Sequence, residues 1–170
     1  MDLLADYRIP FVGLKPGKHE FQMRVDSKFF ACFPHSDVNQ VRGHVDVLLD
    51  KLDVTMTLLL DLEATLDAPC DRCLDPIQVP LTASDRISIR FGEDTSMEDE
   101  LWILGTNEYE LDLSQTIFEL VHLARPTRTI HDNEADCDLA MTEWHDESSE
   151  EGDQANDIDP RWAALKGLDN

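Results

Sequence analysis

Alternating apolar and polar residues fill much of the first two thirds of the chain. In His19–Val25 the apolar positions recur at every second residue, with Glu20 and Arg24 among those between. The same period continues in Val41–Leu52 and in Val54–Leu62. A period of two residues is typical of a half-buried β-strand. Asp53 lies between the last two runs, so we expect a turn there and an antiparallel strand pair.

The third run leads into a candidate hairpin. Ala64–Ala68 carries the strand to a tip at residues 70–75, and Ile77–Leu81 returns from it. Three further strand candidates and one acidic loop follow before any helical pattern. The strands are Ile87–Phe91, Leu101–Leu104 and Tyr109–Leu111, and the loop is Glu93–Glu100.

One convincing helix is predicted over Leu113–Ala124. Asp112 is a good N-cap residue, and Gln115 stands three positions later, as in a capping box. Pro126 should end the helix, because proline cannot continue the hydrogen-bond ladder. The apolar face of this helix comprises Ile117, Leu120, Val121 and Ala124.

This order of elements predicts an α+β fold. Many strands precede a single helix, which favours a mainly antiparallel β-sheet or a barrel-like domain, with the helix in the C-terminal half. We expect this β-rich domain to span residues 1–140. Residues 141–158 form an acidic stretch, and we expect it to be a disordered linker. Residues 159–170 regain helical spacing, which predicts a short terminal helix.

The net charge of −22 narrows the classes of function. A chain this acidic should repel nucleic acid and anionic membranes at long range, because affinity for phosphate comes mainly from Lys and Arg. No secretory signal and no membrane span are visible, which favours a cytoplasmic protein with reduced thiols. The acidity has two interpretations: adaptation to a high-salt cytoplasm, or the effect of one acidic tail.

Cys70 and Cys73 stand three residues apart at the predicted hairpin tip. Two thiols at this spacing either share a metal ion or form a redox pair. A reactive pair usually opens a helix, whose N-terminus lowers a thiol pKa. This pair lies between strands, and its neighbours Asp71 and Asp75 should disfavour a thiolate. The spacing therefore favours metal binding over redox chemistry. The remaining alternative is that the two cysteines are small residues in a tight turn and keep free thiols.

Several segments of the second half together resemble the bacterial YceD family of large ribosomal RNA subunit accumulation proteins. No single piece is very specific, but the order and spacing of the pieces are. The matching pieces are Cys70-Asp71-Arg72-Cys73-Leu74, Asp112–Leu123 with Arg125-Pro126, His131–Glu134 with Cys137, and Asp159–Leu165.

The resemblance implies a non-enzymatic factor for accumulation, processing or stability of large-subunit ribosomal RNA. Its partners would be ribosomal RNA, basic ribosomal proteins or assembly factors, with neither a small-molecule substrate nor a membrane. The sequence agrees in lacking a glycine-rich phosphate loop, GxSxG and HExxH. The alternative is a zinc-stabilised protein-interaction module unconnected to ribosomes. Many relatives carry a further cysteine cluster after the helix, whereas this chain retains Cys137.

A structural zinc site needs four nitrogen or sulfur ligands. Cys70 and Cys73 supply two, and Cys137 and His131 are the best candidates for the others. His122 and His145 are weaker candidates.

Arginines and the terminal segment are the candidates for RNA or partner binding. Arg72 at the hairpin tip should project outward, where its guanidinium could grip phosphate or carboxylate. For any one arginine, pairing with one of the chain's own carboxylates is the competing interpretation. Exposed Trp and Arg dominate binding hot spots, although the terminal segment could instead dock on the β domain. The candidates are Arg72, Arg125, Arg128, Arg161, Trp162 and Leu165.

Overall fold

The computed structural model describes residues 3–38, 40–98 and 100–137. They belong to one compact unit, Met1–Asp138. The predicted linker at 141–158 and the terminal segment at 159–170, with Arg161, Trp162 and Leu165, lie outside the described residues, and so does His145.

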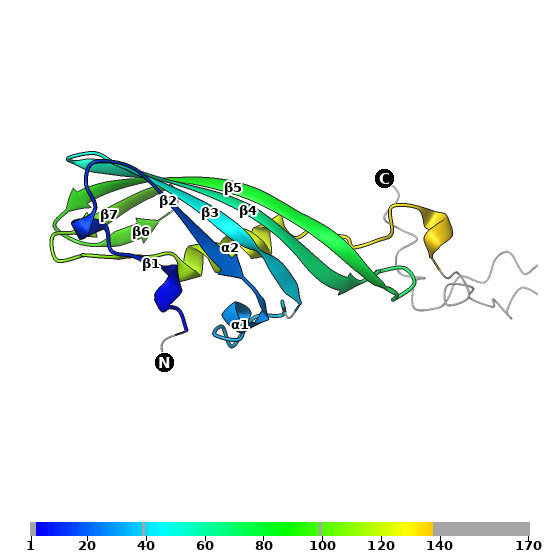
Figure 1. Ribbon diagram of the computed structural model, residues 1–170. Helices are drawn as coiled ribbons and strands as arrows, with labels where there is room; N and C mark the ends of the chain where they lie inside the picture. Colours follow the sequence, from blue (N-terminus) through cyan, green and yellow to red (C-terminus); the bar gives the residue numbers. More distant parts are fainter. Residues whose placement is uncertain (1–2, 39, 99, 138–170) are drawn as a thin grey trace, which may run out of the picture. The chain divides into compact units, whose positions relative to one another are not determined.

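A six-stranded sheet dominates the described part of the chain (Figure 1). Its spatial order is β2-β3-β4-β5-β7-β6, so β2 and β6 are its edges and the sheet is open. The prediction of a mainly antiparallel sheet is confirmed, and the barrel-like alternative is wrong. The strands are β2 Gly17–Val25, β3 Val41–Lys51, β4 Thr55–Pro69, β5 Pro76–Gly92, β6 Ser96–Glu98 and β7 Leu101–Gly105.

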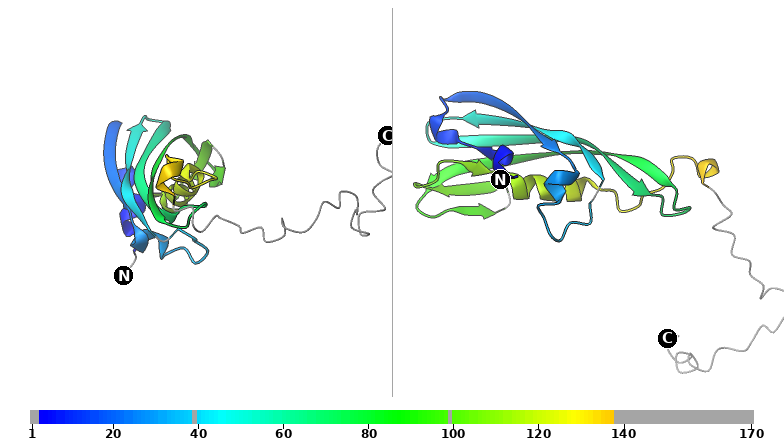
Figure 2. Two further views of the ribbon diagram at one scale, coloured as in Figure 1. Left: turned by 90° about the vertical axis from the view of Figure 1, so that its right-hand side faces the viewer. Right: turned by 60° about the horizontal axis from the view of Figure 1, so that its bottom comes forward.

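Helix α2 (Ser114–Ala124) packs against β5, and the sheet curls around it (Figure 2). Strands β1 (Arg8–Ile9) and β8 (Leu111–Asp112) form a separate antiparallel pair. No helix in the described residues has the length and apolar content to cross a membrane. The short helical elements are α1 Ser27–Phe30 and the 3-10 turns η1 Ala5–Tyr7, η2 Phe11–Gly13 and η3 Glu134–Asp136.

Strands β4 and β5 form one long hairpin, paired without interruption from Thr55↔Arg90 to Pro69↔Pro76. The sequence predicted two strands, Ile77–Leu81 and Ile87–Phe91, where the structure has the single strand β5. The residues between them are small or polar, but none breaks a strand. Ala83 continues the inward alternation opposite Leu62, so the ladder runs on.

The edge formed by β6 and β7 differs from the prediction. Strand β6 lies inside the predicted acidic loop Glu93–Glu100, and it pairs antiparallel with β7. Strand β7 fills the place beside β5 and runs parallel to it. The two-residue period predicts a strand but carries no information about which neighbour the strand pairs with, so this topology was not visible in the sequence.

Alternation separates a buried face from an open face along the sheet. On β4, Leu58 and Leu60 are fully buried beneath α2, whereas Asp61 and Glu63 are exposed on the opposite face. Burial of a leucine side chain contributes roughly 1.5–3 kcal/mol, so these inward rows supply much of the driving force for folding. The predicted face of α2 is confirmed: Ile117, Leu120 and Val121 are buried and Ala124 is partly buried.

Helix α2 is confirmed, but its N-cap position is Leu113, which makes no side-chain bond, and Asp112 caps the helix from one residue earlier. It begins at Ser114, one residue later than predicted, and the Asp112 carboxylate accepts bonds from the Ser114 backbone N–H (3.0 Å) and hydroxyl (2.6 Å). The capping box is wrong, because Gln115 donates to Glu119 instead. Arg125 adopts an extended conformation after the last turn, as expected for a residue before proline.

Removing the Asp112 side chain, by Asp112→Ala, should lower the free energy of unfolding by about 1–2 kcal/mol at neutral pH. The variant loses the cap of α2 and the 3.0 Å bond from Arg8 Nε. Burial raises the pKa of the Asp112 carboxyl, but the bonds from Ser114 and Arg8 outweigh it and hold the pKa below the ordinary 3.8. The stabilisation is therefore present above pH 3.8 and is lost as the pH falls through the lowered pKa. Urea unfolding across this range measures it.

Asp112→Asn is the matched control, because asparagine keeps a capping oxygen. It should cost clearly less than Asp112→Ala. Equal losses of unfolding free energy in the two variants, or no loss in either, would contradict the capping role.

Candidate metal centre

The β4–β5 hairpin positions Cys70 and Cys73 at its far end. Proline occupies the last pair of the ladder, Pro69↔Pro76, and proline donates no hydrogen bond, so regular pairing stops there. The tip is closed by two backbone bonds, from Cys70 N–H to Asp75 O (2.8 Å) and from Leu74 N–H to Cys70 O (2.9 Å). Leu74 takes the left-handed conformation (φ 65°), which turns the chain back into β5.

This tight turn points backbone N–H groups at the Cys70 sulfur. The Arg72 N–H lies 3.4 Å from Cys70 Sγ. Burial raises the pKa of the Cys70 thiol, but bonds from the backbone N–H groups of Cys73, Arg72 and His131 and from the His131 side chain outweigh it. The pKa falls from 9.0 to about 6. The thiolate that binds metals is thus favoured, although the flanking carboxylates suggested the opposite.

Asp71 joins the hairpin tip to the segment after α2. Its backbone N–H donates to Thr129 O, and its Oδ2 accepts from the Thr129 N–H, both at 2.6 Å. This reciprocal pair fixes the backbone two residues before His131. No local pattern predicts this pair, because 58 residues separate the partners.

The 3-10 turn η3 brings Cys137 to the same place. The Asn133 side-chain oxygen accepts from the Ala135 N–H (3.1 Å) and the Asn133 carbonyl accepts from the Asp136 N–H (3.1 Å). This turn lets Cys137 reach the imidazole six residues earlier, with Cys137 Sγ 3.4 Å from His131 Nδ1.

The structure brings together the four residues that the sequence nominated as ligands. The donor atoms of Cys70, Cys73, His131 and Cys137 all lie within 4.8 Å of one another. Cys73 Sγ lies 3.6 Å from His131 Nδ1. The three cysteines are buried and His131 is half-buried. This cluster can hold a metal ion.

The cluster forms a small core of its own, apart from the main core beneath the sheet. Partly buried Ile77 on β5 and Ile130 beside His131 pack against the three cysteines. So few apolar side chains bury little surface. The segment around residues 129–137 is therefore held mainly by hydrogen bonds and by any metal ion that the four donors bind.

The weaker ligand candidate His122 lies elsewhere. Its Nδ1 is 2.9 Å from Phe118 O, and its Nε2 is 3.3 Å from Asp37 Oδ1. The ring packs against Phe118 and Phe30, so His122 belongs to an aromatic cluster on the helix rather than to the metal cluster.

The candidate arginines divide among different surfaces. Arg125 makes a two-oxygen ion pair with Asp37 (2.8 and 2.9 Å), which is the competing interpretation from the sequence. Arg72 is half-buried rather than projecting outward, and Arg128 is exposed beside the Asp71–Thr129 pair.

A protein-family model described as "Large ribosomal RNA subunit accumulation protein YceD" matches residues 58–169. The match covers about two thirds of the chain and includes most of the β4–β5 hairpin, helix α2 and all four clustered donors. It confirms the resemblance carried by the motifs. No curated protein and no solved structure matched the chain.

Proposed function

Because this chain belongs to the YceD family, we propose that it is a non-enzymatic cytoplasmic factor for the accumulation, processing or stability of large-subunit ribosomal RNA. The family match is the observation that carries the proposal. Ribosome assembly needs proteins that bind and hold components in place, and such a role requires surfaces rather than a reaction centre.

We infer that the cluster of Cys70, Cys73, His131 and Cys137 binds zinc. Three thiolates and one imidazole suit a tetrahedral zinc ion, whereas calcium and magnesium require oxygen ligands. With bonds of ~2.3 Å to sulfur and ~2.0 Å to nitrogen, tetrahedral angles place a sulfur and a nitrogen about 3.5 Å apart. The separations of 3.4 and 3.6 Å from His131 Nδ1 to two of the sulfurs agree with this geometry.

The donor set favours a structural site over a catalytic one. Catalytic zinc sites keep one position open for water or substrate, whereas structural sites are closed by four protein ligands. Here four side chains are close enough to supply all four ligands, and three of them are buried. Bound zinc would fasten the segment after α2 to the hairpin tip. This supports the non-enzymatic proposal.

Removing the Asp71 clamp, by Asp71→Ala, should lower zinc affinity by roughly 10–100-fold, the usual effect of losing a group that orients a ligand. Asp71 Oδ2 holds the Thr129 N–H and so positions His131. Competition with a zinc chelator of known affinity measures the effect. In Asp71→Asn the amide can turn its oxygen toward the Thr129 N–H, so zinc affinity should fall much less in this variant than in Asp71→Ala.

Asp75→Asn is the control for charge. Asp75 is exposed at the same tip, and its contact with Cys70 uses the backbone carbonyl, which the variant keeps. A purely electrostatic role of Asp71 predicts equal losses of zinc affinity in Asp71→Ala, Asp71→Asn and Asp75→Asn, and that outcome would contradict positioning through Thr129.

We expect the partner contacts to be mainly with protein. A net charge of −22 repels phosphate, whereas ribosomal components rich in Lys and Arg would be attracted. Arg72 and Arg128 beside the metal cluster are our candidates for any direct contact with RNA.

Depleting the protein in its own cells tests the proposed function. The ratio of large-subunit to small-subunit ribosomal RNA should fall, and re-expression of the unaltered chain should restore it. An unchanged ratio would overturn the ribosomal role. The alternative, a zinc-stabilised interaction module outside ribosome assembly, would then be favoured if affinity purification recovers one stoichiometric partner without ribosomal proteins or RNA.

A further inference from the structure

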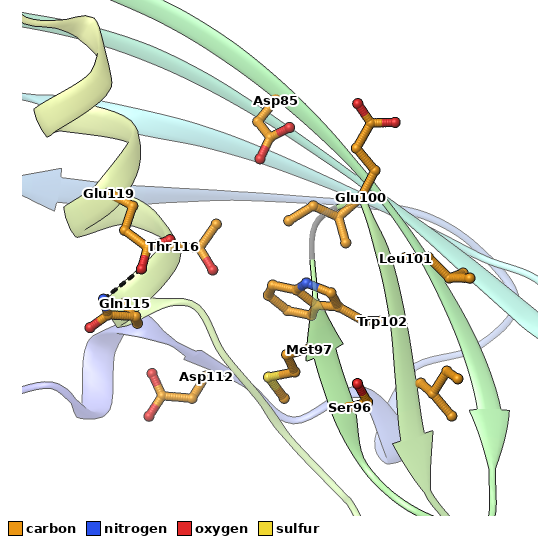
Figure 3. A pocket seen from close by; sticks show the side chains of 12 residues that line it. Asp85, Ser96, Met97, Glu100, Leu101, Trp102, Asp112, Gln115, Thr116 and Glu119 are labelled. Atoms are coloured by element: carbon orange, nitrogen blue, oxygen red, sulfur yellow. Dashed lines mark hydrogen bonds between the residues drawn. The ribbon is translucent and has the colours of Figure 1, made fainter.

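A groove of about 890 Å³ lies between helix α2 and strands β5, β6 and β7 (Figure 3). It lies toward the end of β5 that pairs with β7, away from the cysteine tip. Trp102 extends from β7 toward the helix, between Met97 and Glu100 (Figure 3). Met97 keeps 45% of its surface exposed here. Apolar side chains line the groove, and no described element covers them.

The charge lining this groove has a single sign. Its lining includes the four carboxylates Asp85, Glu100, Asp112 and Glu119, and it includes no Lys, Arg or His. Asp112 is already bonded to Ser114 and Arg8. Within the described part of the chain the other three have no cationic partner, so the groove carries uncompensated negative charge.

Trp102 adds a second and independent feature. Its side chain is 4% exposed, and no group in residues 3–38, 40–98 or 100–137 accepts a hydrogen bond from its indole N–H. In those residues no fully buried side-chain nitrogen or oxygen lacks a partner, so the indole nitrogen must keep its small exposed area. That area opens into the groove that Trp102 lines. A donor held this way is available to an acceptor from outside the described residues.

These two features select the chemistry of the occupant. A metal ion would use the carboxylates, but it cannot bond to an N–H donor. A nucleic acid offers acceptors, but its phosphates would be repelled by the carboxylates. A peptide with Lys or Arg side chains offers both cations and acceptors. Its cations pair with the carboxylates, and a backbone carbonyl accepts from the indole N–H.

We propose that this groove binds a Lys/Arg-rich segment of a partner protein. Glu100 on the sheet side and Glu119 on the helix side hold its cationic side chains, and Asp85 faces the space between them. The Trp102 N–H donates to a backbone carbonyl of the segment, and Met97, the residue paired with Trp102, packs against its aliphatic stems. The groove is distinct from the metal cluster, and it does not depend on the partner being ribosomal.

Binding of a synthetic peptide in which Lys alternates with Leu, followed by fluorescence anisotropy at near-physiological salt, tests the proposal on the full chain. The double variant Glu100→Gln/Glu119→Gln should weaken binding about tenfold, from loss of two charge pairs. The control Glu20→Gln/Glu63→Gln removes the same charge from exposed positions on the open face of the sheet. It should change affinity by less than about twofold, because distant charges are screened.

The Trp102 N–H provides a readout that needs no change to the groove. In ¹⁵N-labelled protein its indole signal, identified by its loss in Trp102→Phe, should shift on addition of the peptide. Equal losses of affinity in the two double variants, or an unmoved indole signal, would overturn the proposal. Displacement of the peptide by single-stranded RNA would also overturn it and assign the groove to nucleic acid. Because this assay involves no ribosomal RNA levels, it can fail or succeed independently of the depletion experiment.

Discussion

Replacing Cys137 with serine should abolish stoichiometric zinc binding, whereas the unaltered chain, purified without a polyhistidine tag, should carry about one zinc ion. Cys137 Sγ lies 3.4 Å from His131 Nδ1 and completes the set of four donors. Structural zinc contributes roughly 10–16 kcal/mol of apparent binding free energy in small domains, so losing one of four ligands is expected to be a large effect. Metal analysis by mass spectrometry measures it.

The structural change caused by the loss of zinc should stay local. The cysteine cluster packs against Ile77 and Ile130 and is separate from the core beneath the sheet. We therefore expect Cys137→Ser to keep its β-sheet circular dichroism while amides of residues 129–137 exchange much faster with solvent. Zinc binding and local protection should disappear together, because the few apolar contacts of this segment cannot hold it alone.

Cys32→Ser is the matched control for this prediction. Cys32 is half-buried near α1, and its thiol donates to Lys28 O rather than joining the cluster. Zinc content should be unchanged in this variant. Full retention of zinc in Cys137→Ser, or its absence from unaltered protein purified with zinc under reducing conditions, would refute the metal centre.

Truncating Leu60 to alanine should lower the free energy of unfolding by about 2–5 kcal/mol. Leu60 is fully buried in the middle of β4, in register with Val47 on β3 and Asp85 on β5. Because the neighbouring backbone is fixed by two strand ladders, it cannot close the resulting cavity. For a domain whose total stability is typically 5–15 kcal/mol, this is a severe loss. Urea unfolding should show a lower midpoint with an unchanged slope.

Leu59→Ala is the same substitution one residue earlier on the same strand. Leu59 points to the open face of the sheet, where it lies opposite Leu48 and Arg86 and is half-buried. In Leu59→Ala the free energy of unfolding should fall by about 1 kcal/mol or less. Similar losses at both positions would contradict the assignment of the two faces.

The metal ligands could be nominated from sequence because their side-chain chemistry is rare. Few residues other than Cys and His bind a tetrahedral metal, so the CxxC pair pointed to a short list of candidates. The sequence analysis already ranked His131 above His122, and the tertiary structure gives the physical reason. Both follow the hairpin by tens of residues, but His122 is held within an aromatic cluster by the packing of α2, whereas the Asp71–Thr129 pair places His131 at the tip.

The arginine surface could not be predicted in the same way. Arginine finds partners among many carboxylates in this chain, and the sequence does not say which carboxylate is nearest in space. Asp37 and Arg125 are 88 residues apart, and they meet because the loop after α1 packs beside the end of α2. The groove at Trp102 escaped notice for the same reason, since its lining comes from four separate strands and a helix.

The sequence by itself determined the features that depend on near neighbours: the alternation of each strand, the apolar face and proline stop of α2, the thiol pair at a hairpin tip, and the family. These follow from side-chain spacing within a few residues. Only the tertiary structure decided the parallel place of β7, the meeting of His131 and Cys137 with the hairpin, and the acidic groove that keeps the Trp102 N–H available. Those depend on which distant segments pack together, because buried surface and long-range hydrogen bonds are shared between residues far apart in the chain.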